Sequence, residues 1–209
     1  MHSRLHPRQS SAPLNNSTTL LNMILCNRLD EVTSGILLFG RTRNATQQVS
    51  AAFAEGTVHK CYVALSDRKP KKKQGTIRGD MAKSRRGSWK LLHTTQDPAV
   101  TKFTSSAVPS SRPGLRMYIV RPLTGRTHQI RVAMKSIGVP ILGDIRYADK
   151  GLAEKEDRTY LHAATISFVL HGQLIRISCV PNTGSEFLSP AFQAVWQEHS
   201  PEFLHSEVQ

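Results

Sequence analysis

The sequence predicts an α+β domain with a mixed, mostly antiparallel sheet and flanking helices. Strand-like and helix-like segments interleave along the chain, and segments 163–170 and 173–180 flank His171-Gly172, a dipeptide typical of a tight β-hairpin. The 209 residues are 39% hydrophobic and 21% charged, which is enough apolar surface for the core of one domain. No internal repeat and no domain boundary is visible.

The first part of the chain predicts an irregular segment, then a strand and a helix. Residues 1–26 are expected to form an atypical, partly disordered N-terminal segment, because Ser, Asn and Pro are frequent there without periodicity. The apolar run 36–39 predicts a buried strand. A helix is expected from Asn44, as N-cap, to a stop at Gly56. Its apolar positions are Val49, Ala52 and Phe53.

Two later segments predict strands from the alternation of their side chains. Residues 60–65 and 115–120 each alternate between two sets of side chains, as a strand does. Segment 66–98, which lies between them, has few apolar residues and is expected to be loop with short strands. In the first strand, one face would carry Cys61, Val63 and Leu65, and the other Lys60, Tyr62 and Ala64.

Two helices are expected towards the C-terminus. Thr127 is a plausible N-cap for a helix over 128–137 that Gly138 ends, with Arg131 on the face away from the core. Ser189-Pro190 predicts the start of the last helix. The apolar stripe of the first helix consists of Ile130, Ala133, Met134 and Ile137.

The positive charge of the chain is concentrated in two windows. The formal net charge is +13, from 28 Lys+Arg against 15 Asp+Glu. Segment 68–90 holds ten bases and one acid, Asp80, and segment 112–146 holds seven bases and one acid, Asp144. Segregated bases favour a surface that binds the phosphates of a nucleic acid. For the run 70–73 alone, a solvated loop is an equal alternative.

Several classes of protein are excluded by the sequence. No apolar run approaches the ~20 residues of a membrane span, and no secretory signal is visible. Three cysteines, an odd number without Cys-x-x-Cys spacing, argue against a disulfide scaffold or a zinc ribbon and favour a reducing cytoplasm. Because nucleotide-binding glycine loops and metal-ligand clusters are also missing, we expect neither a cofactor nor a metal.

Three short constellations could carry chemistry. Asp30 precedes Thr33, Ser34 and Gly35, whose amides and hydroxyls could hold its carboxylate ionised; an ordinary turn into a strand is the alternative. Segment 125–131 is a glycine turn into a helix start that could bind a phosphate or carboxylate, or simply be a capped basic helix start. The third is the tight apolar turn 140–144, for which packing alone is the alternative.

Taken together, these motifs resemble the RluA-type RNA pseudouridine synthase family. The resemblance rests on Arg28-Leu29-Asp30-x-x-Thr33-Ser34-Gly35, Lys60-Cys61-Tyr62-Val63-Ala64, Gly125-Arg126-Thr127-His128-Gln129-Ile130-Arg131-Val132, Pro140-Ile141-Leu142-Gly143-Asp144 with Tyr147, and Leu161-His162-Ala163, in family order. It spans about residues 27–180 and implies a pseudouridine synthase catalytic domain over 27–209 with a basic insert at 68–90.

The resemblance also implies roles for individual residues. Asp30 matches the catalytic aspartate, and Arg131 the arginine that pairs with the aspartate. Tyr62 matches the tyrosine that stacks on the target base and helps with proton transfer. Arg28 matches the arginine that enters the space left by the flipped nucleotide, and Leu161 falls near the apolar wall of the uracil pocket. Further residues expected to contact RNA are Lys71, Lys72, Lys73, Arg85, Arg86 and Arg126.

The resemblance implies an isomerase that converts uridine to pseudouridine in structured RNA, either ribosomal or transfer RNA. We expect a monomer without a membrane partner or a nucleotide cofactor. The alternative is a non-catalytic RNA-binding protein that retains the fold after loss of its N-terminal part. A basic protein with no role in RNA is the third hypothesis, and its absence of tight binding at moderate salt would distinguish it.

Overall fold

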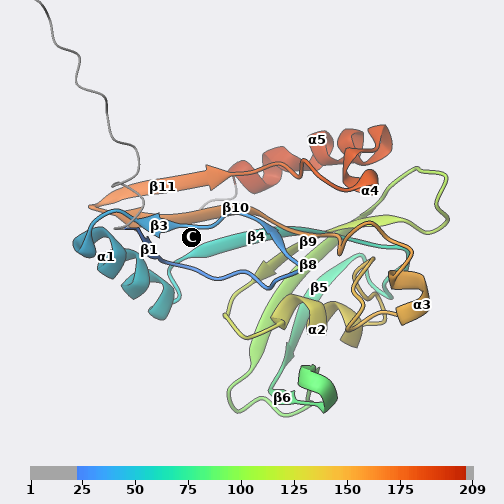
Figure 1. Ribbon diagram of the computed structural model, residues 1–209, viewed down its shortest axis with the longest axis horizontal. Helices are drawn as coiled ribbons and strands as arrows, with labels where there is room; N and C mark the ends of the chain where they lie inside the picture. The colour runs from blue at the N-terminus through green and yellow to red at the C-terminus, as the bar shows by residue number, and fades with distance from the viewer. Residues whose placement is uncertain (1–22, 206–209) are drawn as a thin grey trace, which may run out of the picture.

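A computed structural model of the protein describes residues 23–205 (Figure 1). Most of the expected N-terminal segment 1–26 therefore lies outside the described residues. Its last residues contain β1 (Ile24–Leu25), which pairs antiparallel with β3 (Phe39–Gly40).

A seven-stranded sheet forms the centre of the fold. Six strands follow the order β11-β10-β4-β9-β8-β5, each antiparallel to its neighbours, and β2 pairs parallel with β10. The expected mixed, mostly antiparallel sheet is thus confirmed. The strands are β2 (Ser34–Gly35), β4 (His59–Ser66), β5 (Gln74–Gly79), β8 (Ala99–Ala107), β9 (Arg116–Pro122), β10 (Leu161–Leu170) and β11 (Gln173–Ser178).

The two faces of the sheet bury the two side-chain sets that the sequence predicts. Cys61, Val63 and Leu65 pack in one core cluster with residues of α4 (Ser185–Leu188) and α5 (Pro190–His205). Tyr62 and Ala64 pack on the opposite face, in a cluster that includes the apolar stripe of α2 (Gln129–Ser136). In Figure 1, α4 and α5 lie above the sheet and α2 lies below it. The face covered by α2 is the one that carries the candidate site.

The helix and hairpin signals are mostly confirmed, with shifted caps. Helix α1 (Arg43–Ala54) is capped by Thr42, whose hydroxyl accepts from the amide of Ala45, rather than by the predicted Asn44. Because Thr42 stands in the extended conformation an N-cap requires, the helix begins earlier than predicted. The β10–β11 hairpin turns through His171 and Gly172, with φ angles of 51° and 76°.

The predicted buried strand at 36–39 is wrong. Ile36 is buried and its amide donates to the carbonyl of Ala163, but Leu37 and Phe39 are 45% and 51% exposed. The run leaves the edge of β10 after Ile36 and pairs with β1 from Phe39, so its middle residues belong to neither ladder. An apolar run alone does not reveal such a change of partner.

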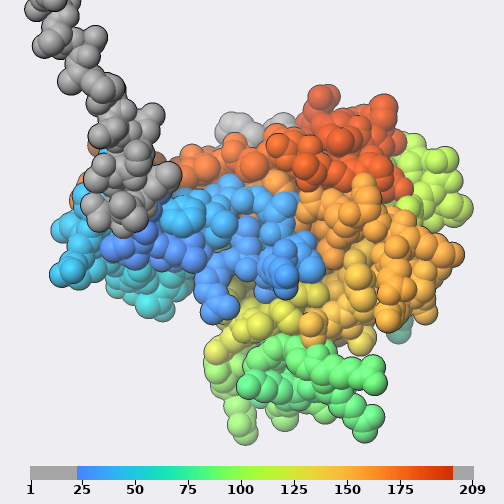
Figure 2. All heavy atoms as spheres, in the orientation of Figure 1, coloured from blue at the N-terminus to red at the C-terminus, as the bar shows by residue number. Residues whose placement is uncertain are grey.

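Segment 66–98 consists of loop with short strands, as predicted. It contains β5, an edge strand of the central sheet, followed by a hairpin of β6 (Met81–Lys83) and β7 (Trp89–Leu91). A single 3-10 turn, η2 (Arg85–Gly87), forms the tip of the hairpin. Figure 2 shows this hairpin, in green, projecting from the main body of the molecule.

The described part of the chain limits two further possibilities. None of its helices combines the length and the apolar character needed to cross a membrane. Within the same residues, no group of three or more His, Cys, Asp or Glu side chains is arranged to hold a metal ion.

Candidate active site

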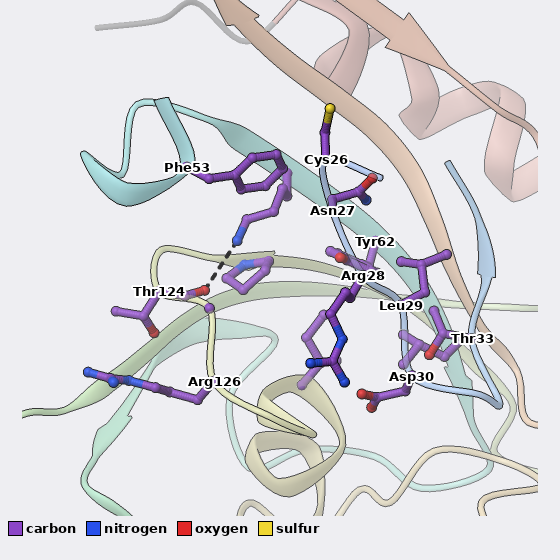
Figure 3. A pocket seen from close by; sticks show the side chains of 15 residues that line it. Cys26, Asn27, Arg28, Leu29, Asp30, Thr33, Phe53, Tyr62, Thr124 and Arg126 are labelled. Atoms are coloured by element: carbon purple, nitrogen blue, oxygen red, sulfur yellow. Dashed lines mark hydrogen bonds between the residues drawn. The ribbon is translucent and has the colours of Figure 1, made fainter. Parts of the chain in front are cut away.

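A cavity of about 370 Å³ lies where the chain after β1 crosses the α2 face of the sheet (Figure 3). This volume is within the range of small-molecule sites. The predicted site residues that line it are Arg28, Asp30, Tyr62, Arg126 and Leu161. The structure therefore brings together residues from four distant parts of the sequence.

Asp30 is held at the cavity by a turn that is docked on β10. The amide of Thr33 donates to the carbonyl of Asp30 at 2.8 Å, which closes the turn, and Gly35 then pairs with Ala163. Gly35 has a φ of 114°, and a Cβ atom there would lie 2.3 Å from the carbonyl oxygen of Ala163. Only glycine allows this approach, so the Gly at position 35 fixes where the Asp30 turn sits.

The hydroxyl of Ser34 does not support Asp30, contrary to the sequence prediction. It shares a hydrogen bond of 2.8 Å with Nδ1 of His162 and accepts one of 2.6 Å from Nη2 of Arg158. His162 is buried, and its Nε2 lies 3.0 Å from the carbonyl oxygen of Cys179. Burial lowers the pKa of His162. The neutral ring thus anchors the Asp30 turn from behind.

Arg131 is the charged partner of Asp30, but its shorter hydrogen bonds are to Asp144. Nε and Nη2 of Arg131 each donate to the Asp144 carboxylate at 2.8 Å, whereas Nη1 donates to Asp30 at 3.4 Å. The side chains of Arg131 and Asp144 are 5% and 0% exposed, and that of Asp30 is 24% exposed. Arg131 does point away from the α2 core cluster, as predicted, yet it is buried because segment 144–147 covers it.

The start of α2 differs from the predicted anion site. His128, with a φ of 56°, is the N-cap residue instead of Thr127. The side-chain carbonyl of Gln129 accepts from the amide of Arg126 at 2.9 Å and from the hydroxyl of Thr124 at 2.7 Å. The backbone amide of Arg126 is therefore already hydrogen-bonded within the chain. The guanidinium of Arg126 pairs with Asp97 at the surface. These contacts leave little support for a bound phosphate or carboxylate at this turn.

Tyr62 lines the cavity from β4 with a half-buried side chain. Burial, reinforced by the negative charge of Asp30, raises its pKa to about 12. The phenol is therefore neutral near pH 7, so it can donate a hydrogen bond or present its ring to a base. Leu161, from β10, contributes an almost fully buried apolar wall to the same cavity.

Lys60 is a cavity residue to which the sequence assigned no role. Its Nζ donates to the carbonyl of Thr124 at 3.3 Å and lies 6.0 Å from the centre of the Phe53 ring (Figure 3). Burial lowers its pKa. The sequence did indicate this position, because Lys60 stands two residues before Tyr62 and therefore lies on the same face of the strand.

The other residues predicted to bind RNA occupy three separate places. Arg28 is exposed and extends from the cavity rim on the same side as Asp30 (Figure 3). Lys71–Lys73 come just before the end of β5 that pairs with Thr104. The opposite end of β5, which pairs with Ala99, lies nearer the cavity. Arg85 and Arg86 lie at the hairpin tip, beside Asp144. The predicted basic insert is thus divided between two ends of β5.

Asp144 is the important residue that sequence reasoning missed. The turn 140–144 was a candidate constellation, but no role was predicted for Asp144, although it is the one acid among seven bases in segment 112–146. A single acid among many bases is expected to pair with one of them. The sequence thus contained an indication that Asp144 has an arginine or lysine partner.

Comparison with known proteins identifies relatives. Residues 2–136 match the family model described as RNA pseudouridylate synthase. An uncharacterized RNA pseudouridine synthase of Haemophilus influenzae is 48% identical over 166 residues, which cover 79% of this chain and 72% of the relative. Ribosomal large subunit pseudouridine synthase C of Rickettsia prowazekii is 33% identical over 143 residues, 68% of this chain, and the match spans about half, 47%, of that enzyme.

Solved structures share the fold. Human RNA Pseudouridylate Synthase Domain Containing 1 superposes with a TM-score of 0.70 at 23% identity, covering 82% of this chain and 72% of the human chain. Human RNA Pseudouridylate Synthase Domain Containing 4 superposes with a TM-score of 0.61 at 20% identity, covering 79% and 73%.

Proposed function

The chain belongs to the RNA pseudouridylate synthase family, and we propose that it isomerises uridine to pseudouridine in RNA with Asp30 as the catalytic carboxylate. The observation that carries this proposal is the position of Asp30. It lies in a cavity with a neutral aromatic ring and an apolar wall, and the buried cation Arg131 is 3.4 Å away.

The reaction suits these groups. The N1–C1′ bond of uridine breaks, the uracil turns, and a C5–C1′ bond forms; the C5 proton leaves and N1 gains one, so the product is an isomer. When N1 departs, the sugar carbon becomes electron-poor, and a carboxylate beside it can stabilise its charge or bond to it. Asp30 would supply this carboxylate, and Arg131 would orient it.

The remaining cavity residues would hold the detached base. The ring of Tyr62 would stack on the uracil while it rotates, and Leu161 would form the apolar floor that limits its movement. The target nucleotide must leave its helix to reach the cavity, and Arg28 at the rim is placed to fill the space it leaves.

A tritium-release assay tests the role of Asp30. RNA labelled at uridine C5 loses tritium to water only when C5 forms its new bond, so the wild-type chain should release it. Asp30→Asn should reduce release to background, while the neighbouring exposed variant Glu31→Gln should behave as wild type. Wild-type release by Asp30→Asn would sink the assignment. An intact chain that binds RNA without release would instead favour the non-catalytic alternative.

Ribosomal RNA of the large subunit is the substrate that the relatives favour over transfer RNA. The relatives from Rickettsia prowazekii and Vibrio vulnificus are both named ribosomal large subunit pseudouridine synthase C. Such a substrate would place the protein in the cytoplasm. We also propose that the protein acts as a monomer. Mapping pseudouridine in total RNA with and without the protein would identify the modified uridine, and sites confined to transfer RNA would refute this choice.

A further inference from the structure

A second cavity, of about 580 Å³, adjoins the ion pairs of Arg131 and is lined by basic side chains. It lies between the β6–β7 hairpin, the segment after Asp144 and the start of α3 (Lys150–Ala153). In Figure 2 the hairpin, in green, meets the yellow and orange segments of this region. Besides Arg131, four cationic residues line it, and we call these four, Arg85, Arg86, Arg146 and Lys150, the basic cleft.

The charge of the basic cleft is not neutralised from within. Asp144 is the acid that lines the cavity, and it is fully buried against Arg131. In the described part of the chain, Arg85 and Arg86 form no ion pair. Lys150 pairs with Glu154 at 3.5 Å, but both side chains are more than half exposed, so the pair is weak. Arg85 and Arg86 therefore face the cavity without an acidic partner among the described residues.

Directed hydrogen bonds hold the basic cleft together. Nη1 of Arg146 donates to the carbonyl of Arg86 at 2.6 Å, and the amide of Trp89 donates to the hydroxyl of Tyr147 at 3.0 Å. That hydroxyl also lies 2.8 Å from Nδ1 of His128. Arg86 has a φ of 54°, a conformation that a non-glycine residue adopts at a cost, and the bond from Arg146 helps to maintain it. The hairpin tip is thus docked beside Asp144.

The two cavities meet at one ion pair. Asp30 lines the first cavity, Arg131 lines the second, and their charged groups are 3.4 Å apart. In the proposed reaction, a nucleotide whose base occupied the first cavity would have its ribose near Asp30 and its phosphates outside the cavity. The strand that continues from it would pass the basic cleft.

We propose that the basic cleft binds backbone phosphates of the RNA substrate, on the side of Arg131 opposite to the base cavity. This inference rests on the proposed function and adds Arg146 and Lys150 to the residues that contact RNA. Guanidinium groups suit phosphates because their forked donors match two phosphate oxygens at once. Phosphate contacts fix the register of the RNA strand and carry no information about its sequence.

Salt-dependent binding of the full chain tests the proposal. The probes are labelled dodecauridylate and large-subunit ribosomal RNA, titrated between about 50 and 200 mM KCl. For dodecauridylate, Arg85→Gln with Arg86→Gln should flatten the slope of log K against log salt by about 1.4, since each lost contact to a single strand removes about 0.7. The matched control is Arg41→Gln with Arg43→Gln, which removes the same charge from exposed positions at the start of α1 and should leave the slope unchanged.

The outcomes separate this proposal from the catalytic one. Equal slopes in the two double variants would overturn the basic cleft as an RNA site. Displacement of the RNA by polyglutamate as readily as by polyphosphate would indicate an acidic protein partner and overturn it as well. In tritium release, the cleft variant should raise KM and leave kcat unchanged. Absence of release by the wild type would refute the catalytic proposal, while the slopes would still decide the cleft.

Discussion

Arg131 and Asp144 form a two-pronged ion pair, with both hydrogen bonds at 2.8 Å, in which neither side chain is more than 5% exposed. Arg131 therefore takes its orientation from Asp144. Its remaining nitrogen, Nη1, is the one that reaches Asp30, over 3.4 Å. Asp144 acts on the candidate carboxylate through Arg131, which makes it a positioning residue.

Asp144→Asn should destabilise the protein and slow its reaction. The substitution leaves the buried guanidinium of Arg131 without its principal counter-charge, a loss that costs about 3 to 5 kcal/mol at buried pairs. Urea unfolding should show this decrease in the free energy of unfolding. Tritium release should fall in kcat at a temperature where the variant is fully folded, because Arg131 is free to turn away from Asp30.

Glu154→Gln is the matched control for Asp144→Asn. It removes the carboxylate of an exposed ion pair, with Lys150, whose side chain is 73% exposed. The free energy of unfolding should change by less than about 0.5 kcal/mol. If Asp144→Asn were as mild as this control, the buried pair would not hold the site.

Gly35→Ala should displace the turn that carries Asp30. A Cβ atom at position 35 would come within 2.3 Å of the Ala163 carbonyl oxygen, on backbone that cannot yield without breaking the β2–β10 pairing. We expect tritium release to fall at least 100-fold, the scale of loss when a positioned group moves by about 1 Å. The free energy of unfolding should fall as well.

Gly56→Ala separates conformational strain from this steric clash. Gly56 also has a positive φ, of 72°, but no atom lies within 4 Å of a Cβ built there. It should lose about 1 kcal/mol of stability and retain its activity. Equal loss of activity in both alanine variants would show that the contact with Ala163 does not position Asp30.

Alternating patterns were sufficient to predict the core of this fold. In β4 and β9, alternate residues belong to two different core clusters. The alternation in the sequence therefore predicts which side chains share a face of the sheet. Segment 36–39 could not be predicted in this way, because its partners are β10, far along the chain, and the short β1. Pairing with a distant edge leaves no periodic trace over four residues.

The residues of the candidate site could be predicted from the sequence, whereas the hydrogen bonds and ion pairs that position them could not. The motifs named Asp30, Tyr62, Arg131 and Leu161, all of which meet at or beside the first cavity. The pairing of Arg131 with Asp144 and the anchoring of Ser34 by His162 depend on how separate elements pack. Such contacts have no fixed sequence spacing.

Tyr62→Phe should retain RNA binding and lose turnover. The ring that would stack on uracil remains, but the hydroxyl that would assist proton transfer is gone, which typically costs 10²- to 10⁴-fold, about 3 to 5 kcal/mol. Because burial raises the pKa of Tyr62 to about 12, its ionisation should not alter the wild-type rate from about pH 7 to about pH 10. Single-turnover rates and RNA affinity, measured separately, check both statements.

Tyr118→Phe provides the corresponding control. Its buried hydroxyl donates to the carbonyl of Arg68, which does not line the first cavity, so the variant should lose about 1 kcal/mol of stability and keep its turnover. A wild-type rate in Tyr62→Phe would restrict Tyr62 to stacking.

The stability of the fold should depend on pH through His162. Burial lowers the pKa of this ring below its ordinary value of 6.5, so the folded state binds fewer protons than the unfolded state in acid. Its stabilising effect is therefore complete above about pH 6.5 and is lost as the pH falls through the lowered folded-state pKa. Tm should decline accordingly, because protonation would set a charge beside Arg158 and would remove the lone pair of Nδ1 that accepts from the hydroxyl of Ser34.

A comparison of three proteins isolates the contribution of His162. His162→Gln, which does not titrate, should have a lower Tm than the wild type at neutral pH but a shallower decline of Tm in acid. His171→Asn alters an exposed hairpin residue with a φ of 51°, which Asn tolerates, and should keep the wild-type decline. His128, whose pKa burial also lowers, is present in all three proteins, so some decline remains in each. Parallel Tm curves for the wild type and His162→Gln would mean that the Asp30 turn is not held by a neutral histidine, because removing the ring would then have removed no proton-linked free energy.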